Sequence, residues 1–297
     1  MVLVLLLLIG PFAQFAPAET LTFQDDLIVW LRADVGVLNE LGNPTASGDE
    51  VNTWEDQATA FSSNARTVND FFNTFNRPAW LADGGPNDNA YVSFTSGGSA
   101  SNSDWLRAEE FFDFSDFTIF AVATGAGNGS QLGSIFWDYG NVGNKQVRMT
   151  VDASGDAFDA YVRDDDKHQI DLGSGTLGEN LSWNVLSSRL SGNQFDLFVN
   201  GDLLDSQSNV NYDSTTWEGT YGDPVMGTIS NFESTHFLDG GISEFLIYRG
   251  ALTDSEREEV ENYLLQRNLG IPEPTAAALL TLGLLTLLPH RPPAGQD

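Results

Sequence analysis

The stretch Gln146–Arg163 reads QVRMTVDASGDAFDAYVR, and its pattern sets the fold class of this chain. In QVRMTV, the apolar residues Val147, Met149 and Val151 alternate with polar residues, so they share one face of a strand. The segment FDAYVR alternates in the same way, and the DASGD link between the two has the composition of a turn. The stretch therefore predicts an antiparallel hairpin of two half-buried strands.

A second hairpin is predicted in QFDLFVNGDLLDSQ, at Gln194–Gln207. Asn200 and Gly201 separate its two apolar runs, and both residues tolerate the positive φ that a type I′ turn requires. The rest of the chain between Leu21 and about Gly270 continues as short apolar segments separated by Gly, Asn, Asp and Ser. Further strands are expected at Leu27–Arg32, Tyr91–Phe94, Phe117–Thr124, Ser134–Tyr139, Trp183–Leu190 and Ile242–Tyr248.

One helix is predicted near the end of this region, in ALTDSEREEVENYLLQRNLG. Thr253 is its N-cap and Glu256 stands at the spacing of a capping box, while Gly270 is placed to end the chain's helical run. Many strands, Gly-rich turns and a single helix predict an all-β protein. We expect a two-sheet antiparallel jelly-roll sandwich with this short C-terminal α-helix packed on its surface.

The charge of the chain is strongly negative, with 42 acidic against 13 basic residues and a net charge of −29. A chain this acidic is not expected to bind nucleic acid. The acidity fits solubility in salty surroundings, calcium binding by some carboxylates, or attraction to basic partners. The sequence has no Cys, which excludes disulfides, thiolate zinc sites and a cysteine nucleophile.

Both ends of the chain have the composition of targeting segments. Residues 1–18 contain an apolar run from Val2 to Ile9 and then Ala16-Pro17-Ala18, the pattern of a signal peptide that is cut near Glu19. At the other end an apolar run of 14 residues, from Thr275 to Leu288, is shorter than the roughly twenty residues of a spanning helix. The alternatives are a buried strand at the N-terminus and a buried helix at the C-terminus.

Residues 271–297 resemble the PEP-CTERM sorting signal. The motif Pro272-Glu273-Pro274 precedes the apolar run, and Arg291 follows it, which is the order of that signal. The resemblance implies export, recognition by exosortase-type sorting machinery and transient membrane contact through the apolar segment. The expected location is the cell surface, outer envelope or extracellular matrix of a bacterium, and residues 19–270 form the expected mature domain.

Several segments of this domain resemble the laminin G-like, concanavalin A-like lectin/glucanase superfamily and follow one another in the family's order. They are LIVWLRADVGV (Leu27–Val37), VNTWEDQ (Val51–Gln57), RPAW (Arg77–Trp80), DFTIFAVA (Asp116–Ala123), LFVNGDLL (Leu197–Leu204) and FLIYRGALTDSEREEVENYL (Phe245–Leu264). The resemblance implies a jelly-roll sandwich whose members mostly bind glycans or proteins and sometimes bind calcium. It does not fix the function, because function depends on sites placed on the fold.

Three functional classes remain open for such a domain. Glucanases of this fold use paired carboxylates that alternate along one strand, and no Glu-x-Asp-x-x-Glu strand occurs here, so we expect no enzyme activity. The expected function is non-catalytic binding of a carbohydrate or another extracellular ligand, with an extracellular glycan or surface polymer as partner. The alternative is a structural cell-surface or matrix protein without glycan binding.

The polar face of the first hairpin is the predicted binding site. If DASGD sets the register, Arg148 lies opposite Tyr161, and Arg163 lies opposite Gln146. Arg and Tyr on such a face can hydrogen-bond and stack against a sugar, so we expect it to bind an anionic or neutral glycan. Ordinary pairing with neighbouring aspartates is the alternative. Trp137 and Tyr139 share one face of another predicted strand and form a second candidate stacking surface, unless they belong to the core.

The acidic turns are candidate binding sites for calcium. The run Asp164-Asp165-Asp166 and the loop around Asp49 and Glu50 are the candidate sites, because calcium takes six to eight oxygens from carboxylates and carbonyls. The chain lacks an Asp-x-Asp-x-Asp-Gly loop, so solvated acidic turns are the alternative.

Overall fold

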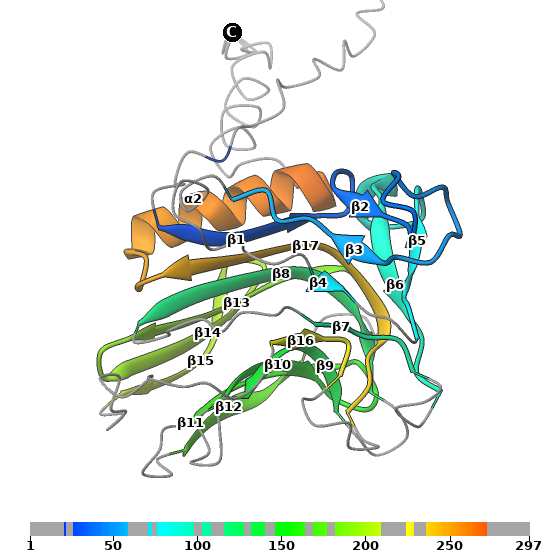
Figure 1. Cartoon of the computed structure of the whole chain (residues 1–297). Helices are drawn as coiled ribbons and strands as arrows, with labels where there is room; N and C mark the ends of the chain where they lie inside the picture. The colour runs from blue at the N-terminus through cyan, green and yellow to red at the C-terminus, as the bar shows by residue number, and fades with distance from the viewer. Residues whose placement is uncertain are drawn as a thin grey trace, which may run out of the picture.

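The protein is a sandwich of two antiparallel β-sheets with one helix on an outer face (Figure 1). The computed structural model describes residues 21, 26–58, 71–72, 76–97, 103–107, 116–127, 132–139, 146–163, 169–176, 182–208, 224–228 and 236–271. Within these residues every strand pairing is antiparallel. The predicted all-β sandwich is confirmed.

The helix-side sheet is the sheet that carries the helix. Its order is β15-β14-β13-β8-β17-β6-β5, and β1 also pairs with β17. The long central strand β17 has β8 along one edge, while β6 and β1 share its other edge. The strands of this sheet are β1 (Leu27–Arg32), β5 (Ala79–Leu81), β6 (Tyr91–Phe94), β8 (Phe117–Ala126), β13 (Asn184–Ser191), β14 (Gln194–Val199), β15 (Asp202–Ser208) and β17 (Asp239–Arg249).

The second sheet, which we call the hairpin sheet, contains the hairpin predicted at Gln146–Arg163. Its order is β12-β11-β10-β9-β16-β7-β4-β3-β2. Its strands are β2 (Val37–Leu38), β3 (Thr53–Trp54), β4 (Phe71–Phe72), β7 (Leu106–Arg107), β9 (Gly133–Tyr139), β10 (Gln146–Val151), β11 (Ala157–Arg163), β12 (Gln169–Thr176) and β16 (Val225–Met226).

The main core fills the space between the two sheets. Val147, Met149 and Val151 are buried in it, on the strand face where the alternation predicted an apolar surface. Phe136 of the hairpin sheet and Phe245 of the helix-side sheet meet with ring centroids 5.1 Å apart. Burial of such side chains stabilises the fold by roughly 1.5–3 kcal/mol each, so this layer holds the sheets together.

Both predicted hairpins form. Arg148 lies opposite Tyr161 and Gln146 opposite Arg163, which is the predicted register. In the second hairpin Asn200 has φ 52° and Gly201 has φ 89°, as a type I′ turn requires. Turn composition and alternation were sufficient to predict both hairpins, because both features act over a few residues.

The helix α2 (Asp254–Leu264) begins with the predicted capping box. The Thr253 hydroxyl accepts from the backbone N–H of Glu256, and the Thr253 N–H donates to the Glu256 carboxylate. A π-helical turn, η3 (Leu265–Leu269), follows and ends at Gly270, whose φ is 64°. Together α2 and η3 cover part of the outer face of the helix-side sheet (Figure 1).

A buried carboxylate of β17 fixes the end of this helical segment. Glu244 is 1% exposed and accepts hydrogen bonds from Tyr263 Oη at 3.1 Å, Arg267 Nε at 3.1 Å and Asn268 Nδ2 at 3.0 Å. Trp30 Nε1 of β1 donates to the same carboxylate at 2.8 Å. Burial raises the pKa of Tyr263, and the Glu244 charge raises it further, which keeps this hydroxyl a donor. The network ties the helix, β1 and β17 together.

No helix among the described residues has the length and apolar character needed to cross a membrane.

Candidate functional site

The predicted hairpin residues form a row across three strands of the hairpin sheet. Arg148 on β10 lies between Trp137 on β9 and Tyr161 on β11, with each pair in register. The guanidinium carbon of Arg148 is 4.2 Å from the centroid of the Tyr161 ring and 5.2 Å from that of Trp137. The structure thus joins two surfaces that the sequence predicted separately, and their role in binding stays a prediction.

The face that carries this row is more buried than its polar composition indicated. Tyr161 is 5% exposed, Trp137 7% and Gln146 9%, and Thr150 is fully buried. The prediction of half-buried strands is therefore wrong for this hairpin. Contacts across the strands account for part of this burial, because the Arg148 guanidinium packs against both rings and Trp137 also packs on Val225.

The remaining predicted residues lie around this row or outside the described part of the chain. Arg163 is partly exposed at the end of β11, and Tyr139 pairs with Gln146 at the end of β9. The acidic run Asp164-Asp165-Asp166 and the motif Pro272-Glu273-Pro274 lie outside the described residues.

The loop around Asp49 and Glu50 makes contacts of its own. A carboxylate oxygen of Asp49 accepts from the backbone N–H of Ala46 at 3.0 Å, and Glu50 lies 3.8 Å from the Arg77 guanidinium. Across the described residues no three or more His, Cys, Asp or Glu side chains are grouped so that they could hold a metal ion.

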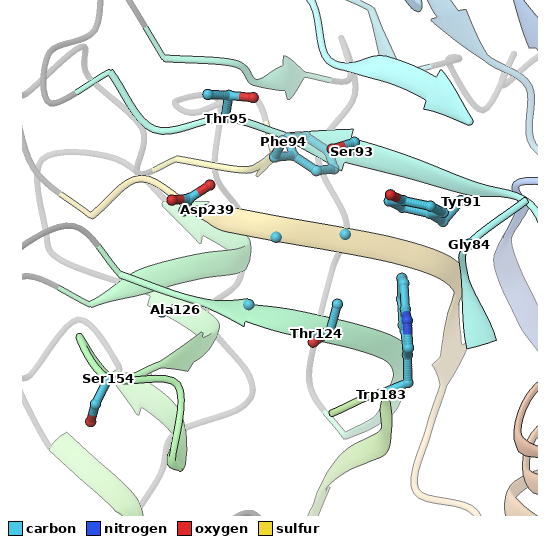
Figure 2. A pocket seen from close by; sticks show the side chains of 13 residues that line it. Gly84, Tyr91, Ser93, Phe94, Thr95, Thr124, Ala126, Ser154, Trp183 and Asp239 are labelled. Carbon is cyan, nitrogen blue, oxygen red and sulfur yellow. The ribbon is translucent and has the colours of Figure 1, made fainter. Parts of the chain in front are cut away.

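A pocket that the sequence did not predict opens on the outer face of the helix-side sheet (Figure 2). Its volume is about 460 Å³, which is within the usual range for small-molecule sites. It lies on β6, β8 and β17, beyond the part of this face that α2 covers. The residues that line it are Gly84, Tyr91, Ser93, Phe94, Thr95, Thr124, Gly125, Ala126, Ser154, Trp183, Asp239, Gly240 and Gly241.

Glycines form the floor of the pocket. A Cβ at Gly241 would lie 2.6 Å from Tyr91 Cδ2 and 2.9 Å from Trp183 Cη2, so the two rings lie directly over the bare backbone. A Cβ at Gly240 would collide with the backbone oxygen of Thr124. Glycine inside a strand weakens it and marks close approach of another group, so this pair makes a depression at the centre of the sheet.

An aromatic pair forms one end of the pocket. The rings of Tyr91 and Trp183 are 5.3 Å apart at an interplanar angle of 75°, an edge-to-face arrangement. Both side chains are partly exposed, and Trp183 also packs against the cluster beneath α2. Figure 2 shows the two rings together at one end, with Asp239 and Thr95 toward the other.

Polar groups surround the rest of the pocket. Asp239 and Thr95 are exposed, and the hydroxyls of Ser93 and Thr124 lie on the neighbouring strands β6 and β8. A flat apolar ring surface beside hydroxyls and a carboxylate matches a sugar, which has an apolar C–H face and hydroxyls on its rim. The arrangement can therefore stack a sugar ring and accept hydrogen bonds from its hydroxyls.

The hairpin predicted from Gln146–Arg163 contributes one residue to the rim of this pocket. Ser154 is in its turn, and Asp152 holds that turn by accepting from the Ser154 hydroxyl at 2.6 Å and from the backbone N–H of Asp156 at 2.9 Å. Burial acts to raise the pKa of Asp152, but the Ser154 hydroxyl and the backbone donors outweigh it and keep that pKa below its usual value. The turn is therefore held by an ionised carboxylate at neutral pH.

One sequence signal for the pocket was present. The segment DGGISEF places Gly240-Gly241 directly before an apolar run, and such a pair in a strand indicates close backbone approach. The signal does not identify Tyr91 or Trp183, because Tyr91 meets β17 only through the pairing of β6, and Trp183 precedes β13, which β8 separates from β17.

Comparison with known proteins shows that the fold of this chain is similar to that of other solved structures. No protein-family model matches the sequence, and a search of curated proteins found no match. Among solved structures, the botulinum neurotoxin serotype G binding domain is similar with a TM-score of 0.52 and 14% identity, over 81% of this chain and 51% of that one. A second structure, titled as the type G receptor binding domain, gives 0.50 and 13% over 81% and 51%.

A third similar structure is the binding domain of Paraclostridial Mosquitocidal Protein 1, with a TM-score of 0.48 and 15% identity over 80% of this chain and 52% of that one. The chain thus spans about half the length of the solved structures it resembles. At these identities the likeness is one of fold, and the two serotype G structures agree with the β-sandwich architecture of this chain.

Proposed function

We propose that this chain is a lectin-like module that binds a saccharide, without cleaving it, in the pocket on β6, β8 and β17. The observation that carries the proposal is the Tyr91–Trp183 pair over the bare backbone of Gly241. The rings supply the stacking surface, and Asp239 with the hydroxyls of the neighbouring strands supplies acceptors at its edge. Aromatic surface with a few placed polar groups is the usual composition of a small-ligand site.

The fold supports a binding role. The similar toxin structures are named as a binding domain and a receptor binding domain, and the laminin G-like resemblance of this sequence implies glycan or protein binding. The proposal goes beyond the fold because it depends on the particular residues of the pocket.

The number of acidic groups in the pocket supports binding rather than hydrolysis. Glycoside hydrolysis generally uses two carboxylates that flank the scissile bond. Among the described lining residues Asp239 is the one carboxylate. Release of reducing sugar from a bound glycan by the purified chain would contradict this part of the proposal.

We further propose that the domain works outside the cell, at the surface or in the matrix of a bacterium. The support is the signal-peptide pattern of residues 1–18 and the PEP-CTERM-like order of residues 271–297, with sorting by exosortase-type machinery. Mass spectrometry of the exported protein tests this: the expected product starts near Glu19 and lacks the apolar run that ends at Leu288. A product that retains both ends would contradict it.

A glycan-array screen tests the central proposal. The wild-type chain is expected to give saturable binding to one class of glycan, and Trp183→Ala is expected to lose it. A double variant, Arg148→Ala with Tyr161→Ala, is the matched comparison, because it removes the predicted site on the hairpin sheet. Loss of binding in the double variant alone would place the site on the hairpin sheet, and silence of the wild type would contradict glycan binding.

A further inference from the structure

We infer that the pocket selects neutral saccharides and rejects anionic ones such as sialic acids and uronic acids. This inference rests on the proposed function and specifies its ligand class. It follows from the charge of the pocket, from the position of that charge relative to the aromatic pair and from the hydroxyl character of the other polar groups.

The charge of the described lining residues comes from one group. Asp239 is exposed at the pocket, and no Lys, Arg or His side chain is among those residues. The whole chain carries a net charge of −29, so the surrounding potential is negative as well. A carboxylate or sulfate on a ligand would therefore meet a like charge with no described cation in the pocket to pair with it.

The position of Asp239 places this charge where a stacked sugar ends. Asp239 and Gly241 are two residues apart on β17, so they share one face of the strand and their Cα atoms are separated by roughly 7 Å. The Tyr91 and Trp183 rings lie over Gly241. Asp239 lies toward the other end of the pocket from the two rings (Figure 2), so a single sugar ring stacked on them would extend toward its carboxylate.

The other polar groups of the pocket favour hydroxyl partners. Ser93, Thr95 and Thr124 each contribute a hydroxyl, a group that both donates and accepts hydrogen bonds, while the Ser154 hydroxyl, which donates to Asp152, can still accept. An ionised Asp side chain accepts only, so it matches the hydroxyl donors of a neutral sugar. An anionic substituent has no donor to offer and brings a second negative charge.

The test compares sugars that differ in one carboxylate. The probes are glucose and glucuronic acid, galactose and galacturonic acid as their methyl glycosides, and lactose with 3′-sialyllactose. Each is titrated into the full chain by calorimetry or followed by saturation-transfer NMR. The expected result is that at least one neutral member binds and that its acidic partner binds at least about tenfold more weakly. Like charges a few ångströms apart near a protein surface repel by more than the roughly 1.4 kcal/mol that a tenfold difference requires.

Two substitutions that each remove one negative charge test whether the pocket sets this preference. Asp239→Asn is expected to narrow the neutral-to-acidic affinity ratio to about threefold or less, because the local repulsion is gone. Asp202→Asn removes the same charge from an exposed position of the edge strand β15 and is expected to leave the ratio unchanged. An equal effect of both substitutions would show that net charge, and not the pocket, sets the preference, which would overturn the inference.

The outcomes separate this inference from the function on which it rests. Wild-type binding of an acidic sugar as tightly as its neutral partner would overturn the neutral preference and leave glycan binding standing. Failure of every sugar to bind would overturn both.

Discussion

The most informative single substitution is Gly241→Ala, because Gly241 supports the aromatic pair without touching a ligand through a side chain. The new Cβ would lie 2.6 Å from Tyr91 Cδ2, 2.9 Å from Trp183 Cη2 and 3.0 Å from Tyr91 Cε2. Carbon atoms are in favourable contact at about 3.5–4.0 Å, so the rings must move by roughly 1 Å. Because both rings are partly exposed, they can give way, and the expected destabilisation is about 1 kcal/mol, near the lower end for overpacking.

Binding should weaken along with stability in this variant. Displacing the rings removes a stacking surface worth about 1 kcal/mol, which predicts an affinity loss of roughly fivefold to tenfold. Calorimetric titration with the best neutral glycan gives the affinity, and urea unfolding gives the stability. Gly192→Ala is the control for a loss of stability without ring displacement: a Cβ there meets nothing within 4 Å, but the φ of 54° strains an alanine, so stability should fall while the affinity stays unchanged. An unaltered affinity in Gly241→Ala would refute the proposed role of the aromatic pair.

Three further predictions address the aromatic wall, the buried network and an ion pair. Trp183→Ala should weaken glycan binding at least about tenfold while Trp183→Phe keeps most of it, measured by the same titration; equal losses would show that the ring is not stacked on the ligand. Glu244→Gln should lower the free energy of unfolding by about 2–3 kcal/mol, measured with urea, because the amide cannot accept from all four donors around Glu244 and Arg267 loses one of its two carboxylate partners, Asp34 being the other; a change within 0.5 kcal/mol, roughly the scatter of surface substitutions, would contradict this. Burial acts to raise the pKa of Asp196, but hydrogen bonds from Arg189 and its other partners outweigh it and lower that pKa. The folded pKa is below the unfolded one, so this stabilisation is present above about pH 4 and is lost as the pH falls through the folded pKa. The stability difference between wild type and Asp196→Asn should therefore shrink in thermal melts below pH 4, and a difference that persists unchanged there would contradict the assignment.

Local features of the fold were predictable from the sequence because short-range physics determines them. The register that places Arg148 opposite Tyr161 follows from alternation and from the length of one turn. Thr253 caps α2 because its hydroxyl accepts from a backbone N–H three residues later, which is a purely local interaction. The sandwich itself followed from many such local features together.

The pocket was not predictable in the same way because long-range pairing assembles it. Tyr91 and Asp239 reach it on the paired strands β6 and β17, while Trp183 comes from the residue before β13, which is separated from β17 by β8. No two of these three residues are close in the sequence, so only the strand order brings them together. The same limit applies to the hairpin face: alternation predicted a polar surface, but the packing of Trp137 against Arg148 on that face depends on the pairing of β9 with β10.

The most direct test of the account is chemical-shift mapping of the backbone amides while the best neutral glycan from the array is titrated into the chain. The account predicts that the shifted amides gather on β6, on the end of β8, at Trp183 and at Asp239–Gly241. Saturable shifts that gather instead around Arg148 and Tyr161 on the hairpin sheet would contradict it.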